Sequence, residues 1–172
     1  MEYGELVRER YSVRKFSDRP VADEMIQTIL ETARVSPTAV NKQPFRILVL
    51  RGAAAMEKLA TCTPYTFGAP MALVVCGCAE EAWVRPYDGD NAYIIDSAIV
   101  GAHIMLAVHN LGLGSTWVGH FDPAALRSAF ALADNLEPIA VFPIGHPAPE
   151  ARPASLHAKR RALEETVIHI ES

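Results

Sequence analysis

Residues 96–122 read DSAIVGAHIMLAVHNLGLGSTWVGHFD. Between its two terminal aspartates this stretch contains no Asp, Glu, Lys or Arg, and it is long enough to cross a bilayer. Two histidines and an asparagine interrupt it, however, and Gly112 is a typical stop signal for a helix. We therefore predict a buried core helix over about 91–110, then a turn and a strand over 115–119, and no membrane span.

On either side of this stretch, hydrophobic periodicity predicts both helices and strands. Asp122 followed by Pro123 favours the start of a helix running to about residue 132, because aspartate caps helices and proline suits their first turn. Another helix begins after Pro20, where apolar residues recur at steps of three and four. Further helices are expected over 2–9 and 54–60, and strands over 45–50, 71–78 and 139–144. Since these elements do not form regular βαβ units, the pattern favours an α+β fold over a doubly wound sheet.

The chain has 172 residues, about the length of one domain. It has 16 Lys and Arg against 20 Asp and Glu, and this acidic balance argues against a general nucleic-acid binder, whose surface must be cationic. Residues 1–51 nevertheless carry a net charge of +2, and residues 52–149 carry −6. The basic residues near the two chain ends are either solvated surface or, if the ends meet, a site for one small anion.

Three cysteines rule out a full disulfide framework and suit a reducing compartment. Cys76 and Cys78 lie in an apolar run, and no histidine spacing nearby completes a metal site, so we expect buried thiols and no metal. The first residues are charged and lack the apolar core of a targeting peptide, so we expect a cytoplasmic protein.

Several common enzyme signatures are absent from the sequence. Gly112 and Gly114 follow a helix and lack the third glycine of a dinucleotide-binding fingerprint. The sequence also has no P-loop, no HExxH and no GxSxG motif. Rossmann dehydrogenases, P-loop enzymes, zincins and typical hydrolases therefore lose support.

Three other stretches carry candidate binding groups. In an extended segment, Arg10, Ser12 and Arg14 point to one side, and two guanidiniums around a hydroxyl suit a phosphate or polyhydroxyl ligand, although a solvated strand edge would look the same. Asn41 and Gln43 suit a flat heterocycle, or ordinary turn chemistry. Backbone N–H groups near residue 119 can donate to a ligand that approaches closely.

The end of the chain is a Pro-rich, basic tether followed by a short apolar segment, Val167–Ile170. So short a strand cannot bury itself alone. It must pair with a sheet edge in this chain or in a partner.

The sequence resembles the FMN-dependent nitroreductase family, at its short-chain end. The resemblance implies an α+β sandwich, in which helices flank a central, mostly antiparallel sheet, and an intertwined homodimer. One domain spans 1–172, and residues 148–172 form an arm that packs on the partner subunit. The matching stretches keep the family's order: RYSVRKF at 10–16, SPTAVNKQPF at 36–45, the whole of 96–122, PIGHP at 143–147 and KRRALEETV at 159–167.

The resemblance also implies that FMN lies at the dimer interface, in a site built from both chains. Arg10, Ser12 and Arg14 then bind its phosphate, ribityl chain and pyrimidine edge, with Tyr11 alongside through its backbone. The partner's loop near the isoalloxazine supplies Pro37, Thr38, Ala39, Asn41 and Gln43. The segment under the ring supplies Trp117, Val118, Gly119 and His120. A second phosphate clamp consists of Arg160 with Lys159 or Arg161.

The implied chemistry belongs to the flavin. NADH or NADPH delivers hydride to N5, and a nitroaromatic, quinone or similar small acceptor then takes two electrons, in ping-pong order. His120, where a small residue is common in the family, is a candidate proton donor or else a solvent-facing ring. Because the loops at 61–70 and 83–91 are brief, single aromatic residues are candidates for closing the pocket: Tyr65, Phe67, Trp83 and Tyr87.

Two alternatives to this function remain. One is a flavoenzyme of the same family with different chemistry, such as dehalogenation, dehydrogenation or flavin fragmentation, since a fold does not fix a reaction. The other is a non-catalytic module that binds or stores FMN.

Overall fold

The computed structural model describes residues 2–171. Each predicted helix is present, with ends that differ by no more than about two residues from those expected. The helices are α1 (Tyr3–Glu9), α2 (Asp23–Arg34), α3 (Ala53–Ala60), α4 (Tyr93–Asn110) and α5 (Pro123–Phe130), with short 3-10 turns η1 (Ala39–Asn41) and η2 (Leu163–Glu165); the strands are β1 (Phe45–Arg51), β2 (Met71–Gly77), β3 (Gly114–Ser115) and β4 (Glu137–Gly145).

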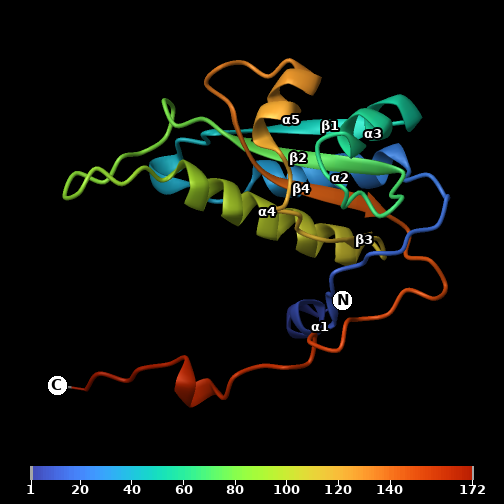
Figure 1. The fold of residues 1–172 in the computed structure, drawn as a ribbon. Coiled ribbons are helices and arrows are strands. Elements are labelled where there is room, and N and C mark those ends of the chain that lie inside the picture. The colour runs from blue at the N-terminus through green and yellow to red at the C-terminus, as the bar shows by residue number, and fades with distance from the viewer. Residues whose placement is uncertain (1, 172) are drawn as a thin grey trace.

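The four strands form one antiparallel sheet in the order β1-β2-β4-β3 (Figure 1). β2 pairs with β1 along its length, from Phe45 opposite Gly77 to Arg51 opposite Met71, and pairs with β4 on its other side. Every residue of β2 is buried, which explains why its sequence is an unbroken apolar run rather than an alternation. The predicted α+β sandwich is confirmed.

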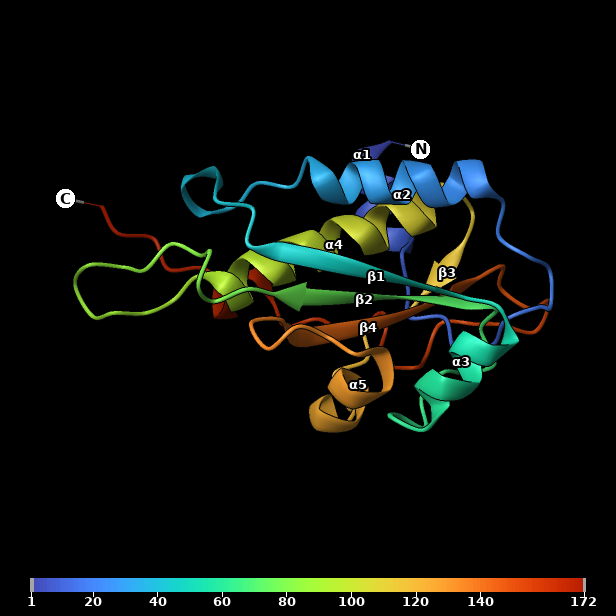
Figure 2. The same cartoon turned by 90° about the horizontal axis from the view of Figure 1, so that it is seen from above.

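Helices cover both faces of this sheet. α2 and α4 lie over one face, and α3 and α5 lie over the other (Figure 2). On the first face Leu73 belongs to the same core as Ile104 of α4, whereas its neighbour Val74 belongs to the core of Leu126 of α5 on the second face. The alternation of side chains along β2 thus supplies two cores.

α4 packs tightly against the sheet at Gly101. A β-carbon at this position would lie 2.6 Å from the ring of Trp117 and 2.7 Å from the ring of Phe142. These two rings pack edge to face, with their centroids 5.1 Å apart. Because only a residue without a side chain fits here, Gly101 lets α4, β4 and Trp117 form one packed unit.

Two predicted strands differ from the structure. The strand expected over 115–119 is reduced to β3 and a single bridge between Val118 and Val141, because the chain leaves the ladder where the Trp117 ring turns onto Phe142. Within residues 2–171, Val167–Ile170 pairs with no sheet edge of its own chain, so pairing with a partner is the one of the two expected arrangements that stays a prediction. The arm that contains it runs away from the sheet (Figure 1).

The prediction that α4 is a buried core helix is confirmed for one of its faces. That face buries Val100, Ile104 and Val108 against α2 and the sheet. Ile94 and Ile95 on the helix's outer side are 51% and 54% exposed. By length and composition α4 could cross a membrane. It nevertheless packs on the sheet as a core helix does, and its outer side, with Ile94 and Ile95, is exposed in the single chain.

Candidate functional site

A pocket of about 210 Å³ lies where the N-terminal segment meets the C-terminal arm, and we call it the cationic pocket. Arg10, Ser12 and Arg14 all line it, as their predicted orientation to one side requires. Of the three adjacent basic residues at 159–161, only Arg160 lines it. Its complete lining is Arg10, Tyr11, Ser12, Arg14, Ala154, Leu156, His157 and Arg160.

The backbone explains this arrangement. The N–H of Val13 donates to the carbonyl of Ser115 at 3.0 Å, and Ser12 forms a parallel bridge with Ser115. The Val13 side chain is buried against Gly114, where a β-carbon would lie 2.6 Å from a valine methyl. With Val13 fixed inward, alternation turns Ser12 and Arg14 outward to the pocket.

The charges in the cationic pocket are not balanced by acids. Within residues 2–171, no ion pair includes Arg10, Arg14 or Arg160. Arg14 Nη1 donates only to the carbonyl of Ser12, at 3.4 Å, and Arg160 Nη1 to that of Lys159, at 2.8 Å. Three guanidiniums that converge without a carboxylate favour a bound anion, and their forked donors suit a phosphate.

A second pocket of about 290 Å³ shares Arg14 with the first, and we call it the aromatic pocket. Its other lining residues are Tyr65, Phe67 and the run Thr116, Trp117, Val118, Gly119 and His120. Among residues 2–171 the backbone N–H of Gly119 makes no hydrogen bond, so it is available to a ligand. A flat, aromatic space thus adjoins a cationic one.

The loop over 61–70 is fastened to this segment. Thr63 Oγ1 donates to the carbonyl of His120 at 2.6 Å, and the rings of Tyr65 and His120 pack edge to face with centroids 5.3 Å apart. Of the four candidate aromatics, Tyr65 and Phe67 therefore line the aromatic pocket. Trp83 and Tyr87 do not, because their loop lies at the opposite end of the sheet (green in Figure 1).

The expected loop residues Pro37, Thr38, Ala39, Asn41 and Gln43 line neither pocket. Their loop follows α2 at the end of the fold away from β3 (Figure 2). The structure therefore brings the N-terminal, C-terminal and 116–120 candidates together, and leaves the 37–43 loop apart from them in the same chain.

Sequence reasoning missed one residue of the cationic pocket and one residue that contacts the 37–43 loop. His157 lines the cationic pocket, with its ring 6.3 Å from that of Tyr11, and its position three residues before Arg160 was the available signal. Asp96 is 2% exposed and accepts the N–H of Ala39 at 2.9 Å. Its signal was an acid at the start of an otherwise apolar helix.

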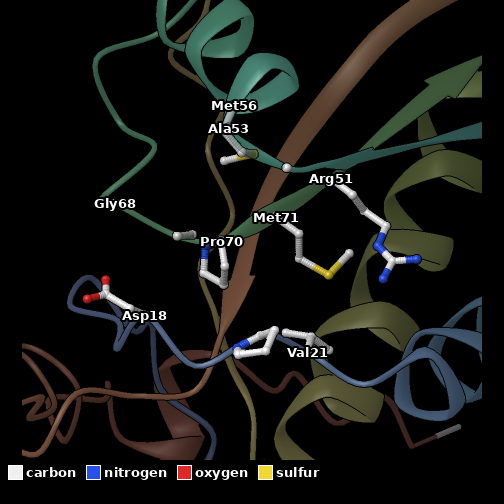
Figure 3. A pocket seen from close by; sticks show the side chains of 11 residues that line it. Asp18, Val21, Arg51, Ala53, Met56, Gly68, Pro70 and Met71 are labelled. Carbon is white, nitrogen blue, oxygen red and sulfur yellow. The ribbon is translucent and has the colours of Figure 1, made fainter.

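A larger cavity of about 430 Å³ lies at the end of β1 and the start of β2 (Figure 3). Its walls are mainly apolar, with Val21, Met56 and Met71 among them, and it includes none of the predicted site residues. Arg51 also lines this cavity, and its guanidinium is already paired with Asp23 Oδ1 at 2.6 Å. Nothing in this cavity selects a ligand.

Comparison with known proteins identifies the family. The family model described as the Nitroreductase family matches residues 7–63 and 60–146. This chain belongs to the nitroreductase family. The match includes Arg10, Arg14 and the whole run from Thr116 to His120, so every residue that lines the aromatic pocket lies within the matched ranges.

The sequences of several relatives match most of this chain's length. A Methanothermobacter thermautotrophicus protein, provisionally named NADH dehydrogenase/NAD(P)H nitroreductase, is 33% identical over 86% of this chain and 78% of its own. The crystal structure of a nitroreductase family protein from Clostridium difficile 630 is 38% identical, covers 100% of both chains and has a TM-score of 0.92. A provisionally named nitroreductase from Desulfovibrio desulfuricans, solved in complex with FMN, is 30% identical over 98% of this chain and 96% of its own, with a TM-score of 0.83.

Proposed function

We propose that this nitroreductase is an FMN-dependent NAD(P)H oxidoreductase. It reduces nitroaromatic, quinone or similar small acceptors by two-electron hydride transfer through flavin N5, in a ping-pong cycle. The observation that carries the proposal is the meeting of a cationic and an aromatic pocket at Arg14. The FMN bound to the Desulfovibrio relative and the NAD(P)H nitroreductase name of the Methanothermobacter relative support it.

The donor set fits FMN. Arg10, Arg160 and His157 would hold the phosphate, because they surround a pocket whose lining contains no carboxylate. The Ser12 hydroxyl is available to the ribityl chain, and Arg14 stands between the pockets, where it would meet the polar edge of the ring. Bound FMN would supply the redox chemistry, which is hydride transfer between NAD(P)H and the acceptor.

The protein's part is to bind, orient and stabilise. We assign the run from Trp117 to His120 as the floor under the ring, with the free N–H of Gly119 as a donor toward N5. The Arg14 guanidinium favours the negative charge that a reduced ring carries, since opposite charges attract. None of these roles requires a nucleophile. Burial raises the pKa of Cys76 to about 11, so that thiol is not one.

We also propose that the working unit is a homodimer. The 37–43 loop cannot join the pockets of its own chain, so a second copy would bring its loop to complete the site. Two unpartnered apolar surfaces support this proposal. The first is the outer side of α4, with Ile94 and Ile95 exposed, which continues into a groove of about 580 Å³ between α1 and α4.

The second apolar surface is the arm over 148–172, which we propose packs on the partner. Leu163, Ile168 and Ile170 are 69%, 88% and 90% exposed. Large side chains this exposed are typical of a segment that docks elsewhere. The arm also carries Arg160, so docking it would hold the cationic pocket in shape.

His120 is our candidate for the proton donor that follows hydride transfer. Its exposed ring borders the aromatic pocket and rests edge-on against Tyr65. The test is a pair of pH–rate profiles, for the wild type and His120→Ala. A lost limb in the variant is expected, and superimposed profiles would end the idea.

We further propose that the enzyme works in the cytoplasm. Its three cysteines are free and buried, which suits a reducing compartment.

The first experiment is the visible absorption spectrum of the purified protein, repeated anaerobically after adding NADH and then NADPH. We expect a flavin spectrum that bleaches with at least one donor, and repeated turnover when a quinone is added. A flavin that neither donor bleaches would favour a storage module. A colourless protein that takes up no added FMN would contradict the proposal.

A matched pair of variants then tests the cationic pocket. Arg10→Gln should raise the dissociation constant for FMN by about tenfold or more, because it removes a charged hydrogen-bond donor from the phosphate. Arg8→Gln removes the same charge from the exposed face of α1, where Arg8 Nε donates to the carbonyl of Gly4, and should change little. Equal effects of the two variants would show that only long-range charge matters.

A further inference from the structure

The backbone of the 37–43 loop is strained. Val40, Asn41 and Gln43 have φ angles of 52°, 55° and 52°, in the left-handed region that residues other than glycine rarely adopt. Such strain persists only where the surroundings enforce it, and it is concentrated at binding and active sites. The question is therefore what enforces it here.

Most hydrogen bonds of the loop are internal. The N–H of Asn41 donates to the carbonyl of Thr38 at 2.9 Å, and the N–H of Gln43 donates to Thr38 Oγ1 at 2.9 Å. Apart from the local bond from the N–H of Phe45, at the start of β1, to the carbonyl of Gln43 at 2.9 Å, a single hydrogen bond among residues 2–171 ties residues 37–43 to another element. It is the bond from the N–H of Ala39 to Asp96 Oδ1 in the first turn of α4, at 2.9 Å.

Asp96 is an expensive residue to bury. It is 2% exposed, it takes part in no ion pair among residues 2–171, and its Oδ2 is buried without a hydrogen-bond partner. A carboxylate so placed destabilises a fold unless it does something that an apolar residue cannot. Its side chain caps no N–H of α4 among the described residues; the N–H of Tyr93 donates to Asn91 Oδ1 at 3.1 Å, whereas Asp96 Oδ1 accepts from Ala39.

We propose that Asp96 is a positioning residue, which holds the 37–43 loop in its strained, ligand-ready shape by accepting the Ala39 N–H. The inference rests on the proposed function, in which this loop completes the FMN site of the partner subunit. Burying the carboxylate costs free energy of folding. In return the loop is already ordered, so FMN binding does not have to supply the free energy of ordering it.

Asp96→Leu is the sharpest test, because leucine has nearly the same shape and no acceptor. In the FMN-free full-length protein, we expect faster hydrogen exchange at residues 39–43 and unchanged exchange in β2. The thermal midpoint should stay level or rise, since a buried polar group with an unpartnered oxygen is removed. The dissociation constant for FMN should increase by about tenfold or more. Asp96→Asn keeps one acceptor oxygen and should restore most of the affinity.

Ser97→Ala is the matched control, since Ser97 is the next residue, is fully buried and has an unpartnered Oγ. It should leave both loop exchange and FMN affinity unchanged. A lower thermal midpoint in Asp96→Leu with unchanged loop exchange and FMN affinity would mean a purely structural role and would overturn the inference. If Asp96→Leu does not fold, Asp96→Asn still decides. Because Asp96→Asn keeps one acceptor oxygen, loop protection from exchange and FMN affinity well below the wild-type values would contradict the inference. A wild-type protein that binds no FMN would defeat the proposed function instead, while the exchange data would still test Asp96.

Discussion

Three buried side-chain atoms on α4 lack a hydrogen-bond partner among residues 2–171: Asp96 Oδ2, Ser97 Oγ and His109 Nε2. Unpaired polar groups of this kind cost free energy of folding, and each one calls for a reason. At Asp96 the reason is the loop that the other oxygen holds. At His109 the consequence is electrostatic. Burial, the largest cause, lowers the pKa of its imidazole from the ordinary 6.5; the charge of Glu9 opposes this effect, and that of Arg10 adds to it.

This histidine predicts a loss of stability in mild acid. The unfolded chain binds a proton near pH 6.5 and the folded chain only at lower pH, so the free energy of unfolding falls as the pH drops below about 6.5. His146, whose pKa is lowered mainly by burial, acts in the same direction. Urea denaturation at about pH 7.5 and about pH 5.5 measures the loss. His109→Gln should reduce it, whereas the exposed His169→Gln should not. Parallel behaviour of both variants would contradict this account.

At the scale of single elements, periodicity and end signals were enough to predict the helices. α5 begins at Pro123, with Asp122 Oδ1 accepting the N–H of Ala125 at 3.0 Å, as the sequence indicates. The β3 region was predicted less well. Apolar residues at 115–119 look like a strand, but the ladder is interrupted after Ser115, where the Trp117 ring packs on Phe142, and only the bridge at Val118 follows. The strand order likewise depends on long-range pairing, which local patterns do not encode.

The packing of α4 on the sheet yields a prediction for Gly101. Gly101→Ala should destabilise the fold by about 1–3 kcal/mol, because the added methyl overlaps the rings of Trp117 and Phe142. Chemical denaturation measures this change. Gly4→Ala, in exposed α1, is the control and should be neutral or stabilising, because alanine favours helix and the only close atom is the mobile end of Arg8. Equal stabilisation by both substitutions would contradict the predicted overlap.

At the scale of the whole molecule, the N-terminal segment that follows α1 meets the start of the C-terminal arm. The N–H of Ala148 donates to the carbonyl of Lys15 at 3.0 Å, and the N–H of Ser17 donates to that of His146 at 2.9 Å. These contacts bring Arg10 and Arg160 to one pocket. The uneven charge distribution of the sequence allowed two interpretations, a solvated surface or a site for one small anion, and the pocket favours the second. Local sequence patterns do not place the 37–43 loop, because a site divided between two chains leaves no signal in one of them. Only the family resemblance predicted that this loop serves the partner's site, and that assignment stays a prediction.

The exposed arm predicts a concentration-dependent dimer. Ile168→Asp combined with Ile170→Asp should raise the dimer dissociation constant by about tenfold or more per residue, because each places a charge on an apolar contact. Sedimentation velocity over a range of concentrations measures it. Ala54→Asp, on exposed α3 across the sheet, should leave the dimer intact. An unaltered dimer in the double variant would show that the arm is not part of the interface.

The separation of the 37–43 loop from the two pockets also has a genetic consequence. If each flavin site takes Arg10 from one subunit and Asn41 from the other, then Arg10→Gln and Asn41→Ala are defects in different halves of the same site. In a mixed dimer both defects fall in one site, and the second site is entirely wild type. Two variants that each bind flavin poorly should therefore complement each other when coexpressed, and about half of the sites in the mixed dimers should recover.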